Sequence, residues 1–156
     1  AHYAAVPPAG GFDNPRDLQG IGTRRGLHAR VVAAIERLHA GRITEHIERI
    51  AHHAVRGELW EKALPYLQQA GARATERLAF PEAADYLEQA VTAAARHPRP
   101  SEVLEQSIDL RVDLRVVLFN LGEFDRVRDH LSQAAAIARE IGDQVRLGQV
   151  TAFQAH

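Results

Sequence analysis

The chain has 156 residues, carries 19 basic and 20 acidic side chains, and is 46% apolar with only 6% aromatic residues. This length suits one domain, the absence of cysteine excludes disulfides, thiolate metal sites and a cysteine nucleophile, and the interleaved charge does not indicate a nucleic-acid-binding face. No apolar run approaches the about 20 residues of a membrane span, and no signal peptide is visible, so we expect a cytoplasmic location without membrane contact. Most apolar residues are Ala, Leu, Val and Ile, which favours an all-α fold.

Residues 1–22 contain repeated helix breakers, including Pro7-Pro8 and Asn14-Pro15, and predict an irregular N-terminal arm. Gly20, Gly22 and Gly26 loosely resemble a phosphate-binding loop. Their spacing is wrong and no Lys-Ser/Thr pair follows, so we predict no nucleotide or other cofactor.

Two helices are predicted next. Thr23 is a plausible N-cap for a helix over about 23–40, which Gly41 would end. The second helix, over about 43–56, would end at Gly57 in the C′ position. Residues expected to face inward on these two helices are Leu27, Val31, Ile35, Leu38, Ile43, Ile47, Ile50, Ala51 and Ala54.

Proline marks the third and fourth helices in opposite ways. Within a third helix, over about 58–78, Pro65 removes a hydrogen bond and predicts a kink or a later helix start. The fourth helix, over about 80–96, has Pro81 in its first turn, where proline is favoured.

The remaining helices follow the same capping logic. Ser101, followed by acidic residues, predicts the cap of a fifth helix that reaches about residue 121. A sixth helix, over 123–141, would end at Gly142, and Asp143 would cap a seventh that the chain end cuts short.

A recurring spacing of large and small residues links these helices. A large residue, a smaller one, a large one and a small one occupy positions i, i+3, i+7 and i+10, on one stripe of a helix. Because small residues let a neighbouring helix approach closely, residues 23–156 predict antiparallel hairpins stacked as an α-solenoid of about seven helices, truncated at its C-terminus. The three occurrences are Trp60, Ala63, Leu67 and Ala70; Phe80, Ala83, Leu87 and Ala90; and Phe124, Val127, Leu131 and Ala134.

Part of this pattern resembles the tetratricopeptide repeat (TPR). Leu67, Ala70-Gly71 and Ala74 resemble its first helix, the quartet from Phe80 its second, and 120–124 its inter-helix turn. Phe80 and Phe124 lie farther apart than the about 34 residues of a standard repeat. The resemblance therefore implies TPR-like hairpins with longer helices.

Residues 24–150 also resemble the join between an AAA-type ATPase module and a TPR-rich region in bacterial adenylate/guanylate cyclase-type proteins. The segments that carry this likeness are 24–31, 51–58 and 60–63. The chain contains neither the cyclase metal-binding aspartates nor a Walker motif, so no enzyme activity is expected of it. The resemblance implies a protein-interaction or regulatory scaffold within a larger bacterial signalling protein. The effector-sensing helical region of a large transcription regulator is an alternative with the same architecture.

A different class of function would use the histidine-rich segment from His39 to His53. Glu48 and His52 form an i, i+4 pair, and His53 is adjacent, so these three residues are candidate metal ligands. A zinc site needs three or four converging ligands, and the rest of such a set is not evident. A metal-dependent enzyme or sensor is therefore the alternative, and a solvated helix face with packed histidines the simpler interpretation.

Partner-binding candidates fall on two surfaces. Solenoids bind proteins or peptides on a concave face, and a last helix with nothing packed beyond it would leave an apolar stripe for dimerisation or partner capture. The candidates are Arg73, Arg77, Tyr86 and Arg111 for the concave face, and Val145, Val150 and Phe153 for the last helix.

Overall fold

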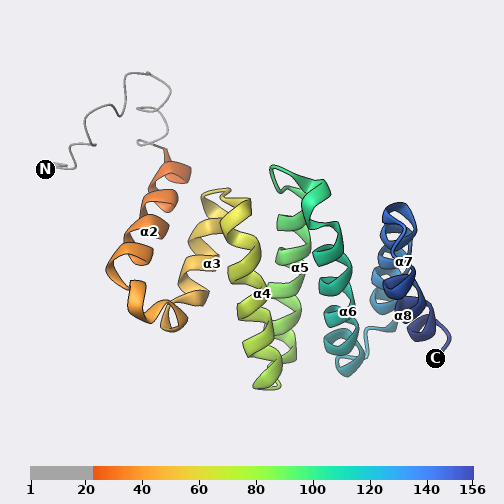
Figure 1. The fold of residues 1–156 in the computed structure, drawn as a ribbon. Coiled ribbons are helices and arrows are strands. Elements are labelled where there is room, and N and C mark those ends of the chain that lie inside the picture. Colours follow the sequence, from red (N-terminus) through yellow and green to blue (C-terminus); the bar gives the residue numbers. More distant parts are fainter. Residues whose placement is uncertain (1–22) are drawn as a thin grey trace, which may run out of the picture.

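The computed structural model describes residues 23–156, and every regular element in that range is a helix (Figure 1). The all-α prediction is therefore confirmed; the predicted arm at residues 1–22 lies outside the described residues. Two short 3₁₀ helices accompany the seven α-helices of this range. The elements are α2 (Arg24–Leu38), η1 (Ala40–Glu45), α3 (Ile47–Arg56), α4 (Trp60–Glu76), α5 (Phe80–Ala95), η2 (Pro100–Val103), α6 (Leu104–Asn120), α7 (Phe124–Ile141) and α8 (Gln144–Gln154).

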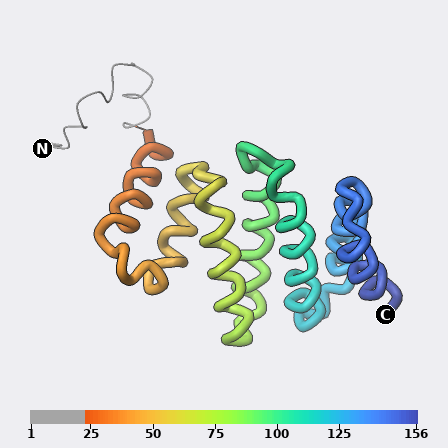
Figure 2. The backbone as a smooth tube through the Cα atoms, in the orientation of Figure 1, coloured from red at the N-terminus to blue at the C-terminus, as the bar shows by residue number. Residues whose placement is uncertain are grey.

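The helices form a row in which each packs mainly on its neighbours in sequence, from α2 at one end to α8 at the other. The chain runs alternately up and down this row (Figure 2). This arrangement is the stacked-hairpin solenoid expected from short connections. No described helix is long and apolar enough to cross a membrane.

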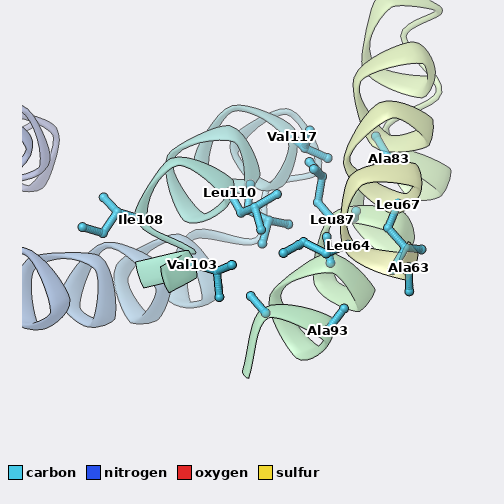
Figure 3. Close-up of a cluster of buried hydrophobic side chains, with 14 of the residues drawn as sticks. Ala63, Leu64, Leu67, Ala83, Leu87, Ala93, Val103, Ile108, Leu110 and Val117 are labelled. Atoms are coloured by element: carbon cyan, nitrogen blue, oxygen red, sulfur yellow. The ribbon is translucent and has the colours of Figure 1, made fainter. Parts of the chain in front are cut away.

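The recurring quartets form the contact surfaces of the row. In all three, the second, third and fourth residues are buried, as the spacing predicts. Figure 3 shows buried leucines, among them Leu64, Leu87 and Leu110, gathered between α4, α5 and α6. The row therefore holds together through one continuous apolar layer, which is the dominant stabilising term in folding.

Two glycines set how closely helices approach. A Cβ on Gly71 would lie 2.8 Å from the Leu87 side chain, so α4 and α5 meet through the bare backbone at this point. Gly57 was predicted as a C′ residue, but it is the C-cap of α3 with right-handed backbone angles. A Cβ there would lie 3.1 Å from the Ala29 backbone, so its role is the close approach of α2 and α3.

Several predicted details of the first two helices are wrong. Leu27 and Leu38 are exposed, whereas Val32, one position along from the predicted stripe, is buried. α3 begins at Ile47 and not near Ile43, because Ile43 belongs to the 3₁₀ turn η1 and the backbone of His46 is not helical. Thr23 does cap α2, since its hydroxyl accepts from the Gly26 amide at 3.0 Å.

The proline and serine signals had mixed outcomes. α4 begins at Trp60 and continues through Pro65, so no later helix start occurs. Because Pro65 lies near the N-terminus of α4, it removes only an early backbone hydrogen bond. Ser101 does not cap α6, which begins at Leu104 after the 3₁₀ turn η2 that contains Ser101. Gly142 and Asp143 have their predicted roles at the end of α7 and the start of α8.

Candidate protein-interaction groove

An open groove of about 860 Å³ lies at the C-terminal end of the row, between α6, α7 and α8. Its walls come from the end of α6, the first half of α7 and the end of α8. The lining residues are Arg115, Phe119, Phe124, Val127, Arg128, Leu131, Ser132, Ala152, Phe153, Gln154 and His156. Within the described residues, no helix packs beyond α7 and α8, and the groove lies at this end of the row.

Aromatic side chains dominate this groove. Phe119 and Phe124 are 59% and 56% exposed, and their rings meet edge to face with centroids 5.4 Å apart. Phe124 is the first residue of its quartet, whereas the equivalent Trp60 and Phe80 are half-buried against the core. An exposed aromatic pair lining a groove is typical of an interaction site, not of a random surface.

A guanidinium group forms one wall of the groove. Arg115 stacks over the Phe153 ring, with its Cζ 3.9 Å from the ring centroid. Its Nε is buried and has no hydrogen-bond partner among residues 23–156. Arg128 and His156 also line the groove; Arg128 pairs with Asp125. The lining contains no Asp or Glu side chain, so its apolar residues are combined with the positive charge of arginine.

An arginine clamp fixes α8, which carries one wall. The Asp143 carboxylate caps α8 by accepting from the Arg146 amide at 2.9 Å. The Arg146 guanidinium also reaches across to α6, where its Nε lies 3.0 Å from Asp109 Oδ1. This contact joins α8 to α6. The amide and guanidinium of Arg146 hold the pKa of Asp143 below its ordinary value.

A polar chain ties α5, α6 and α7 together beneath this end. Glu88 Oε1 accepts from His130 Nε2 at 2.8 Å and from Arg126 Nη2 at 2.7 Å. Arg111 Nη1 lies 2.9 Å from His130 Nδ1. Because arginine can only donate, Nδ1 accepts and the neutral ring carries its proton on Nε2. The His130 hydrogen bond is the main cause of the lowered pKa of Glu88.

The candidates predicted for the last helix have three different positions. Phe153 lines the groove. Val145 is 72% exposed but lies outside the groove lining. Val150 was predicted to be uncovered, and this is wrong: it is fully buried, because α8 turns this face toward the core.

The candidates for the concave face are already engaged within the chain. Arg73 donates to the Thr44 carbonyl at 2.5 Å, and Arg77 pairs with Glu48 at 3.4 Å and Glu82 at 3.1 Å. Arg111 is part of the His130 chain, and burial lowers its pKa.

Tyr86 is the remaining concave-face candidate. It is half-buried, and burial together with the negative charge of Glu48 and Glu82 raises the pKa of its phenol. This surface is therefore stabilised by internal pairs.

The histidine candidates lie close to one another without forming a metal centre. His53 Nδ1 is 2.8 Å from His28 Nδ1, and the His52 and His53 rings stack edge to face. Glu48 instead faces Arg77. No group of three or more histidine or carboxylate side chains within residues 23–156 is arranged to hold a metal ion. Burial and the neighbouring His52 lower the pKa of His53, which favours the neutral ring.

Three residues that shape the groove carry no clear functional signal in the sequence. The spacing that Phe124 shares with Trp60 and Phe80 predicts packing, and no motif marks Phe119 or Arg115. The signal that could have found the groove is that, within the described residues, only α8 packs beyond the helix that carries the third quartet. Comparisons with protein-family models, curated proteins and solved structures give no match for this chain.

Proposed function

We propose that the chain is a protein-interaction module whose C-terminal groove captures an amphipathic helix with acidic flanking residues. The observation that supports this most directly is the exposed Phe119–Phe124 pair in a groove lined by two arginines and no acidic side chain. Aromatic residues and arginine are the side chains that contribute most to protein interfaces. The function is therefore assigned to shape and charge, in keeping with a scaffold role.

The chemistry of the partner follows from the groove. An amphipathic helix presents apolar residues at i, i+3, i+4 and i+7 along one face. A carboxylate beside that stripe would pair with the Arg115 guanidinium, which Phe153 already orients. The resemblance of residues 24–150 adds the expectation that the module belongs to a larger bacterial signalling protein of the cyclase–ATPase type.

A peptide library displayed on phage tests the proposal. Helical peptides selected on the wild-type chain should carry the apolar stripe with flanking Asp or Glu, and should bind more weakly when those acids become Lys. Phe124→Glu should abolish binding. Val145→Glu is the matched control, because Val145 is exposed on α8 but does not line the groove.

Two results would count against this function. Selected peptides without acidic residues, or binding that Phe124→Glu and Val145→Glu reduce equally, would remove the groove from the mechanism. Light scattering tests whether a second copy of the chain occupies the groove instead. A wild-type dimer that Phe124→Glu converts to monomer would assign the groove to that second copy.

A further inference from the structure

A second pocket, of about 310 Å³, lies at the opposite end of the row, where α2 begins. Three helices and the end of a fourth supply its walls: the start of α2, the end of α3, the start of α4 and the C-cap of α5. The lining residues are Arg24, Arg25, His28, Val55, Arg56, Glu58, Trp60 and Arg96. It shares no residue with the groove.

The lining carries a strong excess of positive charge. Four arginines face one glutamate, which leaves a formal charge of +3 with His28 neutral. Arg25 pairs with Glu58 at 3.1 Å, while Glu61 nearby in sequence pairs with Arg99. Arg24 and Arg56 have no carboxylate partner within residues 23–156. The pocket therefore holds cationic groups that the described chain does not neutralise.

The position of two of these arginines is unfavourable for the helix that bears them. Arg24 and Arg25 occupy the first turn of α2, which contains no acidic residue. The N-terminus of a helix has a partial positive charge, so basic residues there cost helix stability, whereas an anion is stabilised. Glu58 offsets the charge of Arg25, and a bound anion would offset that of Arg24.

Trp60 gives the pocket a rigid wall. It packs against the apolar core, and the Arg96 Cζ lies 5.2 Å from the centroid of its ring. Such a cation–π contact limits the positions of the guanidinium before any ligand arrives. Arg96 is in this way oriented at the pocket wall.

We propose that this pocket binds a compact oligophosphate, either as a free ion or as the diphosphate of a small nucleotide. The planar guanidinium fork matches phosphate oxygens in two-point hydrogen bonds. The charge of +3 suits a ligand with more than one phosphate group, and the volume is at the low end of small-molecule sites. This inference does not depend on the groove or on its partner.

Calorimetric titration of the full chain with sodium pyrophosphate, ADP and orthophosphate tests the site. Trp60 is the single tryptophan, so its fluorescence gives a second signal from the pocket wall. Saturable binding of pyrophosphate, tighter than that of orthophosphate, is expected. Tighter binding of ADP than of pyrophosphate would identify the ligand as the diphosphate of a nucleotide. ADP binding that is equal to or weaker than that of pyrophosphate would identify it as the free ion.

Charge variants make the test specific. Arg56→Gln should weaken binding about tenfold, as expected for loss of one charge-assisted contact. Arg139→Gln, in the last turn of α7, is the matched control and should leave affinity unchanged. Glu58→Gln should strengthen binding, because it removes the one carboxylate in the pocket. Circular dichroism checks that each variant keeps its helices.

Three outcomes would overturn the site. One is the absence of saturable heat with both pyrophosphate and ADP. Another is an equal loss in Arg56→Gln and Arg139→Gln, which would indicate general screening by charge. The last is weaker binding in Glu58→Gln, because that result would mean that Glu58 supports the structure of the pocket and does not repel an anion.

Discussion

The central hairpin and the C-terminal end of the row use the same spacing of large and small residues but differ in how far they are closed. In α4 and α5 the aromatic that opens each quartet, Trp60 or Phe80, is half-buried against the core. In α7 the equivalent Phe124 is 56% exposed. The spacing therefore determines which face of a helix packs, while exposure of its first aromatic depends on what lies alongside.

The two regions also differ in what supplements the apolar layer. The central hairpin interlocks through the close approach of Gly71 and Leu87. The C-terminal end adds the Glu88–His130–Arg111 chain and the Arg146 clamp. Charged hydrogen bonds with defined geometry therefore add to apolar packing in fixing the relative position of α5, α6, α7 and α8.

The largest expected effect tests the closed region. Leu87→Ala should lower the free energy of unfolding by about 3–4 kcal/mol, because it opens a cavity between helices that cannot collapse. Leu131→Ala, at the same quartet position beside the groove, should cost about 2 kcal/mol, since its space opens toward solvent. Urea denaturation measures both. Equal losses would show that the C-terminal end is packed as tightly as the centre.

Much of the fold could be predicted because helix spacing, caps and breakers are local. The starts of α2, α5 and α8 follow from Thr23, Pro81 and Asp143, each acting within one turn of its helix. The errors arise where tertiary contacts decide. Val32 replaces Leu27 in the core, and Val150 is buried, because rotation of a helix about its axis depends on the partner it meets.

The candidate sites were less predictable for the same reason. The groove depends on the absence of a cover over Phe124 within the described chain, and the arginine pocket on residues from four separate helices. Neither property belongs to a local segment. Arg73 and Arg77 were expected on a free surface, but their partners lie on other parts of the chain.

A smaller effect tests the polar chain of the C-terminal end. Its hydrogen bonds lower the pKa of Glu88 below the ordinary 4.5, so an unfolded chain takes up this proton first as pH falls. The stabilisation is complete above 4.5 and is lost as pH falls through the folded-state pKa. Glu88→Gln should cost about 2 kcal/mol at pH 7. The difference in free energy of unfolding between Glu88→Gln and wild type should narrow toward pH 3 in urea titrations. A difference that stays constant with pH would contradict this prediction.

Replacing glycine by alanine should change stability in opposite directions at Gly71 and at Gly148. Gly71→Ala should destabilise by about 1 kcal/mol, because the clash with Leu87 outweighs the gain in helix propensity. Gly148→Ala in α8 meets no atom within 4 Å and should stabilise by about 0.5–1 kcal/mol. Combining Gly71→Ala with Leu87→Ala should cancel the clash. Thermal unfolding of the single and double variants measures this. If Gly71→Ala destabilised the Leu87→Ala variant as much as wild type, the loss of stability would have a cause other than the clash with Leu87.

The smallest expected effect separates a binding aromatic from a packing one. Phe124→Ser should cost less than about 1 kcal/mol, since the side chain is exposed and loses mainly its edge-to-face contact with Phe119. Phe80→Ser, at the same quartet position, removes a half-buried ring from the core and should cost more. Chemical denaturation ranks the two, and the selected acidic peptides report binding. If Phe124→Ser destabilised the chain as much as Phe80→Ser, the ring would be part of the fold, and its exposure would no longer support a role in capture.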